Sequence, residues 1–188
     1  KMSYLCELEN YKDKSGTSCP NIEEFYRAFS DADEVFCVTI TGKLSGSFNA
    51  ARIAAREWEV PGKRIHVIDT LSVGPESELI IEKIRELWAL GEEFDSVKEK
   101  ITEYNKRTRL IFSLESMKNL ANNGRVSHIA AKMAGILGIR ALGKASAKGD
   151  LEMLTPTAGV TVEIICDSTS RVSLSDAGKA THEVVKTA

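Results

Sequence analysis

A chain of 188 residues with 43% hydrophobic and 28% charged side chains is long enough for one large domain or two small ones. Its 25 basic and 27 acidic residues are mixed along the sequence, for a formal net charge of −2, which argues against a nucleic-acid-binding surface. No apolar run approaches the roughly 20 residues of a membrane span and we recognise no signal peptide, so we expect a cytoplasmic protein. The cysteines lack metal-ligand spacing, so reduced thiols and no metal site are expected at Cys6, Cys19, Cys37 and Cys166.

The first part of the chain alternates helices and strands. In order, we expect a helix at 21–29 capped by Asn21, a strand at 35–40, a helix at 47–58, a strand at 65–68 and helices at 76–90 and 94–105. Strands separated by helices of this length indicate βαβ units with right-handed crossovers. The sequence therefore predicts an α/β fold with a parallel sheet and helices on both of its faces.

The pattern changes after residue 105. We expect a strand at 110–114, a short helix at 115–121, a turn at 122–125, a helix at 128–137 and a β-hairpin at 139–154. These elements predict a smaller α+β domain at 106–159, ending in the linker-like stretch 155–159. A strand at 162–166 and a helix at about 173–186 are then expected to rejoin the first domain, which would comprise 1–105 and 160–188.

Loops of Ser, Thr and Gly follow each of three apolar strands, at 41–47, 69–75 and 167–170. Because parallel strands end at a common edge, we expect these loops to lie together where ligands usually bind. Helix N-termini at that edge supply free backbone N–H groups, and Lys43 is its main fixed positive charge. The edge therefore suits one carboxylate or one phosphate.

Each of these loops also has a purely structural explanation. Ser45, Gly46 and Ser47 suit an anion at a helix start, but ordinary helix capping gives the same spacing. The hydroxyl pair in the T-S-C-P stretch at 17–20 also fits a capping loop, and Asp167 is expected to order its own loop.

A hydrolase is the less favoured reading of the same residues. Ser45, His66 and Asp69 supply the side chains of a catalytic triad, but His66 lies three residues before its strand ends and is expected to point away from the loops. Cys19 has no histidine placed beside it. No G-x-G-x-x-G follows any strand, which weakens the alternative of a Rossmann-like phosphate or nucleotide binder.

Arg125 follows a tight turn. Gly124 allows a positive φ there, and the arginine is expected to be exposed, either as a contact for a partner or as a solvated side chain.

Taken together, five segments resemble the DegV family. They are T-S-C-P at 17–20, T-G-K-L-S-G-S-F-N-A at 41–50, I-D-T at 68–70, N-N-G-R-V-S at 122–127 and C-D-S-T-S at 166–170. The resemblance implies a two-domain α/β protein that holds a long-chain fatty acid in a tunnel between its domains. It further implies that the protein is the acyl-binding partner of a fatty acid kinase, and that the kinase phosphorylates the bound carboxylate.

The resemblance also implies roles for single residues. Thr17 and Ser45 would bind the carboxylate, and Arg125 would contact the kinase. The same polar end would be lined by Ser18, Gly46, Ser47, Asp167, Ser168 and Thr169. The protein would have no catalytic residues and no cofactor of its own, and its membrane contact would be transient.

The chain departs from the family pattern in two ways. The D-S-T-S segment normally lies near the N-terminus but is found here at 167–170, which implies a circularly permuted or rearranged chain order. The second domain breaks off at 155–159, so a family histidine near the carboxylate has no counterpart to assign.

Overall fold

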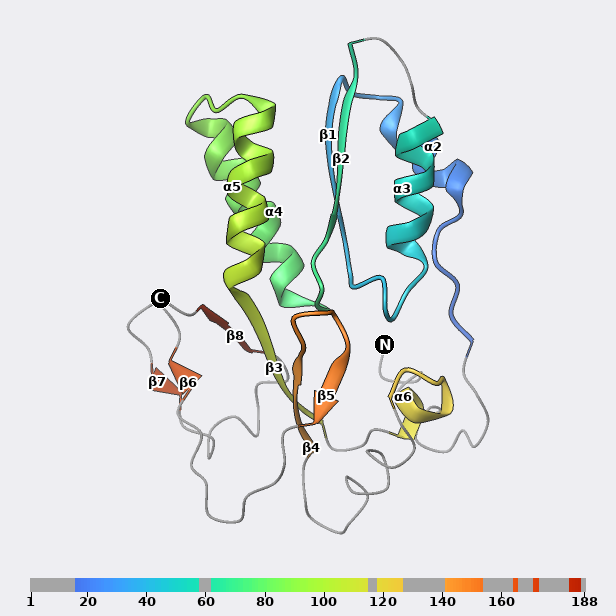
Figure 1. Ribbon diagram of the computed structural model, residues 1–188, viewed down its shortest axis with the longest axis vertical. Coiled ribbons are helices and arrows are strands. Elements are labelled where there is room, and N and C mark those ends of the chain that lie inside the picture. The colour runs from blue at the N-terminus through green and yellow to red at the C-terminus, as the bar shows by residue number, and fades with distance from the viewer. Residues whose placement is uncertain are drawn as a thin grey trace, which may run out of the picture.

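The computed structural model describes residues 16–57, 62–114, 118–126 and 141–153 and three short strands further on. A parallel pair of strands flanked by helices forms one region, and an antiparallel sheet lies below it in the view of Figure 1. The fold is α/β, as predicted.

Helix α2 (Ile22–Phe29) begins with a complete capping box. The Asn21 side chain accepts the Glu24 N–H at 2.9 Å, and the Glu24 carboxylate accepts the Asn21 N–H at 2.7 Å. Two backbone groups that the helix leaves free are thereby satisfied. The predicted cap at Asn21 is confirmed.

Strands β1 (Glu34–Thr39) and β2 (Arg64–Asp69) pair in parallel along their whole length, and α3 (Ser47–Glu57) connects them. Alternate side chains of a strand point to opposite faces. One face, with Val35 and Val67 among its residues, packs on α2 and α3 around a buried cluster of Phe29, Ala51 and Ala54.

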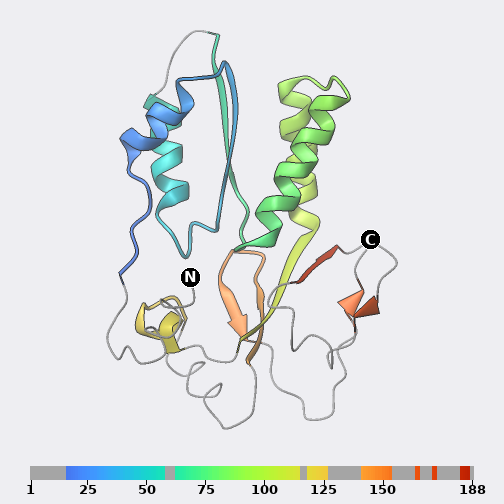
Figure 2. The ribbon, with the colours of Figure 1, turned by 180° about the vertical axis from the view of Figure 1, so that it is seen from behind.

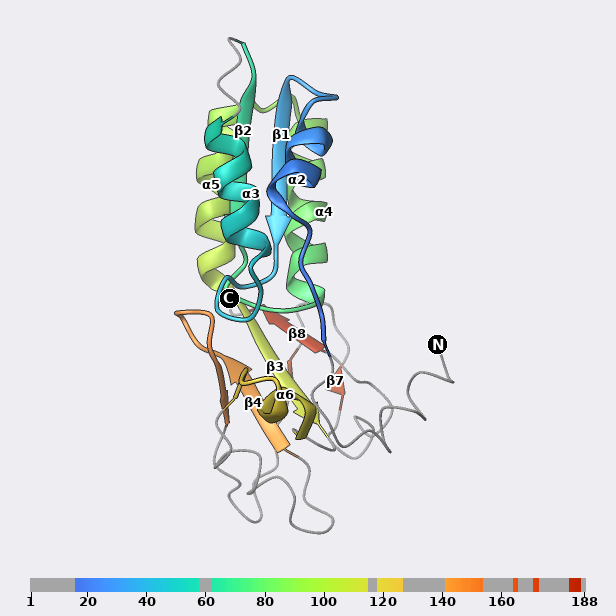
Figure 3. The same ribbon diagram turned by 90° about the vertical axis from the view of Figure 1, so that its right-hand side faces the viewer.

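The opposite face of the pair is covered by α4 (Pro75–Ala89) and α5 (Phe94–Arg107). Phe36 and Val38 pack there against a cluster that includes Ile80 and Ile101, both 0% exposed. Figure 3 shows the resulting three layers from the side, with α2 and α3 in front of the strands and α4 and α5 behind. The predicted helices on both faces are confirmed.

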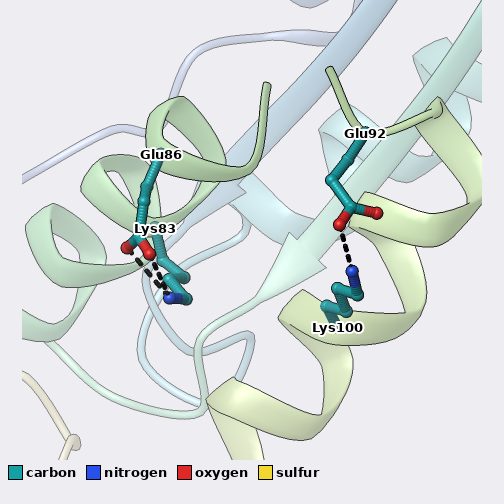
Figure 4. A network of polar contacts seen from close by, with 4 residues as sticks. All are labelled: Lys83, Glu86, Glu92 and Lys100. Carbon is teal, nitrogen blue, oxygen red and sulfur yellow. Dashed lines mark hydrogen bonds and ion pairs between the residues drawn. The ribbon is translucent and has the colours of Figure 1, made fainter. Parts of the chain in front are cut away.

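Two ion pairs lie on the outer surface of α4, α5 and the turn between them (Figure 4). The Lys83 ammonium lies 2.8 Å from the Glu86 carboxylate, and Lys100 donates to Glu92. The bond from Lys100, assisted by Ser96, lowers the pKa of the Glu92 carboxyl. Such exposed pairs contribute little stability, so the apolar cluster beneath them holds this layer together.

The antiparallel sheet has the strand order β5-β4-β3-β8. Its members are β3 (Thr108–Leu114), β4 (Ala141–Ala145), β5 (Leu151–Met153) and β8 (Glu183–Lys186). The predicted hairpin is therefore confirmed as β4 and β5. Helix α6 (Lys118–Asn122) follows β3.

The predicted strand–helix unit at the end of the chain is wrong in two respects. Residues 183–186 form β8, paired antiparallel with β3, where a helix at 173–186 was expected. Strand β6 (Ile164–Ile165) pairs antiparallel with β7 (Arg171–Val172) and not with β1 or β2. The adjacent valines of the E-V-V-K stretch give the physical reason, because β-branched residues favour strands.

Several other predictions fall on residues outside the described ones. They are the helix at 128–137, the linker at 155–159 and the loop at 167–170. The pairing of β8 with β3 adds residues 183–186 to the antiparallel sheet. The predicted division into two domains, one of 1–105 together with 160–188 and the other of 106–159, stays a prediction.

Candidate functional site

The loop after β1 is anchored by Thr41, which is 0% exposed. Its hydroxyl donates to the Gly149 carbonyl at 2.9 Å, and its N–H donates to the Ser72 carbonyl at 2.8 Å. The N–H groups of Leu44 and Ser45 in turn donate to the Thr41 carbonyl. The loop is thereby fixed to the loop after β2 and to the turn of the β4–β5 hairpin.

Asp69 joins the two loops at the ends of the parallel strands. Its carboxylate accepts the Gly42 N–H at 3.2 Å and the Leu71 N–H at 2.9 Å. Leu71 has a φ of +54°, unusual for a residue with a side chain, and the bond from its N–H to Asp69 stabilises that conformation. Asp69 therefore shapes the edge of the sheet by holding backbone groups.

The two serines of the L-S-G-S stretch form a pair at the start of α3. Their hydroxyl oxygens lie 2.9 Å apart, and the Ser47 N–H donates to the Ser45 oxygen at 3.2 Å. Both side chains are half-buried. A Cβ added at Gly46, between them, would come within 3.0 Å of the Cys19 sulfur. Gly46 thus allows the 17–20 stretch to pack closely against this loop.

Arg125 connects the same two loops from a third segment. Its Nη2 donates to the Thr17 hydroxyl oxygen at 3.0 Å, and its Nε donates to the Leu44 carbonyl at 3.2 Å. Gly124 adopts a φ of +69° just before it, as the tight turn requires. Figure 2, from behind, shows α6 next to the loop that leads into α3. Segments more than a hundred residues apart therefore meet at one place.

The structure thus brings together most of the residues that the sequence singles out. Thr17 and Ser18 are exposed, Ser45 and Ser47 are half-buried, and all lie on the two loops that Arg125 joins. Asp167, Ser168 and Thr169 lie outside the described residues. The binding roles of all these residues stay predictions.

Sequence reasoning misjudged the cations of this edge. Arg125 was expected to be exposed but is half-buried between the loops. Lys43, expected to be the main positive charge, has an exposed side chain, whereas the Arg125 guanidinium contacts the hydroxyl loop directly. Sequence reasoning also missed Thr41, because its partner Gly149 lies 108 residues away.

The triad of Ser45, His66 and Asp69 is not assembled. His66 packs edge-on against Phe36 within the strand pair, with ring centroids 5.9 Å apart, and burial lowers the pKa of its imidazole. Asp69 is engaged by backbone N–H groups and Ser45 by Ser47. These contacts agree with the prediction that the His66 side chain points away from the loops.

Cys37 lies in β1 as a free thiol, as predicted, and burial raises its pKa to about 11. Cys19 is also free, on the exposed stretch beside Gly46. In the described part of the chain, no group of three or more His, Cys, Asp or Glu side chains is placed to hold a metal ion. None of the described helices is long and apolar enough to cross a membrane.

A cavity of about 190 Å³ lies where the two regions meet. Its walls include Leu71 and Ser72 after β2, Asn105 at the end of α5, Leu110 of β3 and Ala145 of β4. The lining mixes apolar side chains with hydroxyl and amide groups and includes two basic residues, Lys106 and Arg109.

A comparison with known families shows which one the chain belongs to. Residues 1–160 match the sequence model of a family described as "Uncharacterised protein, DegV family". The chain belongs to the DegV family, as its motifs indicated. The segment 167–170 lies beyond the matched residues, and the permuted or rearranged chain order stays a prediction.

Curated relatives carry the same domain. A DegV domain-containing protein of Streptococcus pyogenes serotype M1 is 47% identical over 145 residues, which cover 76% of this chain and 52% of that protein. One from Streptococcus pneumoniae strain R6 is 44% identical over 147 residues, again 52% of its length. The chain therefore spans about half the length of the curated relatives it matches.

Solved structures show the same fold with ligands. A DegV family protein from Eubacterium eligens loaded with heptadecanoic acid aligns with a TM-score of 0.77 at 41% identity, covering 81% of this chain and 56% of that one. The Fatty Acid Kinase (Fak) B3 protein of Streptococcus pneumoniae, loaded with linoleic acid, gives the same TM-score and identity and covers 81% and 55%.

Proposed function

We propose that this protein binds a long-chain fatty acid and presents its carboxylate to a fatty acid kinase. The main support is the convergence of the Thr17 and Ser45 loops on one guanidinium, that of Arg125. The fatty acids in the two similar structures from Eubacterium eligens and Streptococcus pneumoniae agree with this proposal. In this scheme the kinase carries out the phosphoryl transfer, and this chain supplies no catalytic residue or cofactor.

The hydrogen bonds already made at the site favour an anionic ligand. Thr17 accepts a bond from Arg125, which leaves its own O–H free to donate. Ser45 and Ser47 have two hydroxyl protons between them and use one in their mutual bond, so one O–H remains for a ligand. A carboxylate accepts bonds only, which matches these two free donors. Ser18 and Gly46 lie on the same loops and complete the proposed polar end.

The head and the tail of such a ligand contribute unequally. Burying a tail releases about 0.8 kcal/mol per CH₂, so a chain of some sixteen carbons outweighs two hydrogen bonds of about 1 kcal/mol each. The hydroxyls should therefore orient the carboxylate, while the tail determines affinity.

Native mass spectrometry of the purified protein tests the proposal. We expect a copurified ligand with the mass of a long-chain fatty acid, and organic extraction followed by reloading should restore the complex. A copurified nucleotide or phosphate, or failure to bind any long-chain acid, would overturn the proposal in favour of the Rossmann-like alternative.

The Ser45→Ala variant separates orientation from affinity. We expect it to bind lipid within about fivefold of the wild type, because only about 1 kcal/mol of hydrogen bonding is lost, and to be phosphorylated poorly with a kinase partner. Ser30→Ala, at the exposed end of α2, is the matched control and should behave as the wild type. A loss of lipid affinity of a hundredfold or more in Ser45→Ala would contradict the scheme.

A further inference from the structure

We propose that Arg125 is a positioning residue for the fatty-acid head, acting through Thr17 and independently of any kinase. The inference rests on the proposed function. It adds a second role to a residue that the family resemblance presents only as a contact for a partner.

The guanidinium acts as a clamp between the two hydroxyl loops. Nη2 and Nε are separate donors in one rigid plane, and they engage Thr17 and the carbonyl of Leu44, the residue before Ser45. One side chain therefore sets the spacing between the two proposed carboxylate donors. A lysine has a single ammonium on a flexible stem and lacks this fixed pair of donors.

The clamp also orients the Thr17 hydroxyl. Because the oxygen accepts an N–H from Arg125, its O–H proton must serve another acceptor. Residues 16–20 are exposed along their whole length, so little burial fixes this stretch against α3. The bond from Arg125 and the contact of Cys19 with Gly46 therefore determine where Thr17 lies.

The arginine itself is held by a rigid turn. The Arg125 N–H donates to the Leu120 carbonyl and the Gly124 N–H to the Ala121 carbonyl, both at 2.9 Å. The turn anchors the backbone of Arg125 to α6, so the guanidinium reaches the loops from a fixed base.

The test uses the full chain loaded with palmitate that carries ¹³C at its carboxyl carbon. The carboxyl ¹³C chemical shift reports hydrogen bonding at the head, and no kinase is present. We compare the wild type with Arg125→Gln, Arg125→Lys, Thr17→Val and the double variant Arg125→Gln/Thr17→Val. Arg56→Ala, which removes an exposed cation from the last turn of α3, away from both loops, is the control.

We expect Arg125→Gln and Thr17→Val to move the carboxyl resonance in the same direction, and the double variant to move it no further, because both remove one interaction. Arg125→Lys should fail to restore the wild-type shift, and binding should weaken by no more than about fivefold. The control should retain the wild-type spectrum.

Two results would overturn the inference. If Arg125→Gln leaves the resonance unchanged while Thr17→Val moves it, or if the two changes add in the double variant, Arg125 does not act through Thr17. Should Arg125→Gln fail to fold, Arg125→Lys and Thr17→Val decide the question by the same comparison. Failure of the wild type to bind palmitate at all would instead overturn the proposed function and this inference with it.

Discussion

The parallel and antiparallel regions of the molecule are built differently. The two parallel strands are covered on both faces, and Ile80 of α4 and Val97 and Ile101 of α5 are 0% exposed. In the described part of the antiparallel sheet, the buried cluster is smaller and consists of Leu110, Phe112 and Ala145. The contrast indicates that the parallel strands with α2 to α5 form the stable part of the molecule, which we call the frame. The antiparallel region contributes less to the buried core and completes the candidate site at the ends of β1 and β2.

The candidate site depends on both regions. Loops at the ends of β1 and β2 supply Ser45 and Asp69, but Gly149 of the hairpin fixes Thr41. The turn after α6 supplies Arg125, which fixes Thr17. Changes in the frame should therefore alter global stability most, while changes at the junction should alter the geometry of the site.

The largest effect is expected from Ile80→Ala. The side chain is fully buried, so its truncation should lower the free energy of unfolding by about 2–5 kcal/mol, measured by urea denaturation. Ile81, the next residue on α4, is 40% exposed, and Ile81→Ala is the matched control with a change below about 0.5 kcal/mol. Equal losses in the two variants would contradict the frame role of this core.

Gly149→Ala should have a somewhat smaller effect and act at the junction. A methyl group there would collide with the Thr41 hydroxyl and approach the Leu71 Cα to 3.3 Å, on a residue whose φ is +84°. Overpacking of this kind costs about 1–3 kcal/mol, with a further contribution from the strained φ. We expect lower stability together with weaker retention of fatty acid.

Gly91→Ala separates the cost of steric overlap from the cost of the strained φ. Gly91 has a similar φ of +78°, but nothing lies within 4 Å of an added Cβ. Its variant should show the cost of backbone strain alone and leave lipid retention unchanged. If Gly149→Ala lowers stability no more than Gly91→Ala, the close packing of the hairpin turn on Thr41 is unimportant.

The two regions also differ in how far sequence predicts them. In the parallel region the helical spacing of Phe94, Val97 and Ile101 and the cap at Asn21 are local signals, and the structure confirms each of them. At the end of the chain the adjacent valines are a weak local signal for a strand, and the pairing of residues 183–186 with β3 that completes it is a long-range contact, so a helix was predicted there wrongly.

The site shows the same division between local and distant signals. Ser45 and Ser47 were visible as a local motif, and their mutual bond spans two residues. The bond from Arg125 to Thr17 spans 108 residues, so the sequence named both residues without joining them. Only the folded chain shows that they form one unit.

Glu76 lies at the start of α4, beside the loop after β2. The side chain is 1% exposed and neither carboxyl oxygen makes a well-formed hydrogen bond. Burial raises its pKa above the ordinary value of 4.5, and the nearby Ser72 hydroxyl and the Glu76 backbone N–H offset only part of that effect. The folded state therefore holds this proton more tightly than the unfolded state. Its contribution to stability is fully present below pH 4.5 and is lost as the pH rises through the raised pKa.

Glu76→Gln should remove that pH dependence, since the amide has no proton to lose in this range. Between pH 4.5 and 8, the free energy of unfolding of the wild type should fall relative to that of the variant, by about 1.4 kcal/mol for each tenfold difference in proton affinity between folded and unfolded states. Glu78→Gln, at an exposed position two residues on, is the control. Parallel pH profiles for the wild type and Glu76→Gln would show that this carboxyl is not buried as described.

The smallest effect is expected at the outer edge of the frame, from Asn21→Ala. The variant removes the side chain that accepts the Glu24 N–H, and loss of an N-cap costs about 1 kcal/mol. Asn21 follows the 17–20 stretch directly, so fraying of α2 should also loosen the loop that carries Thr17. Asn21→Asp keeps an acceptor at the cap and should restore both stability, by urea denaturation, and the ¹³C shift of bound palmitate. If Asn21→Ala lowers stability yet leaves that shift unchanged, the clamp from Arg125 holds Thr17 without help from α2.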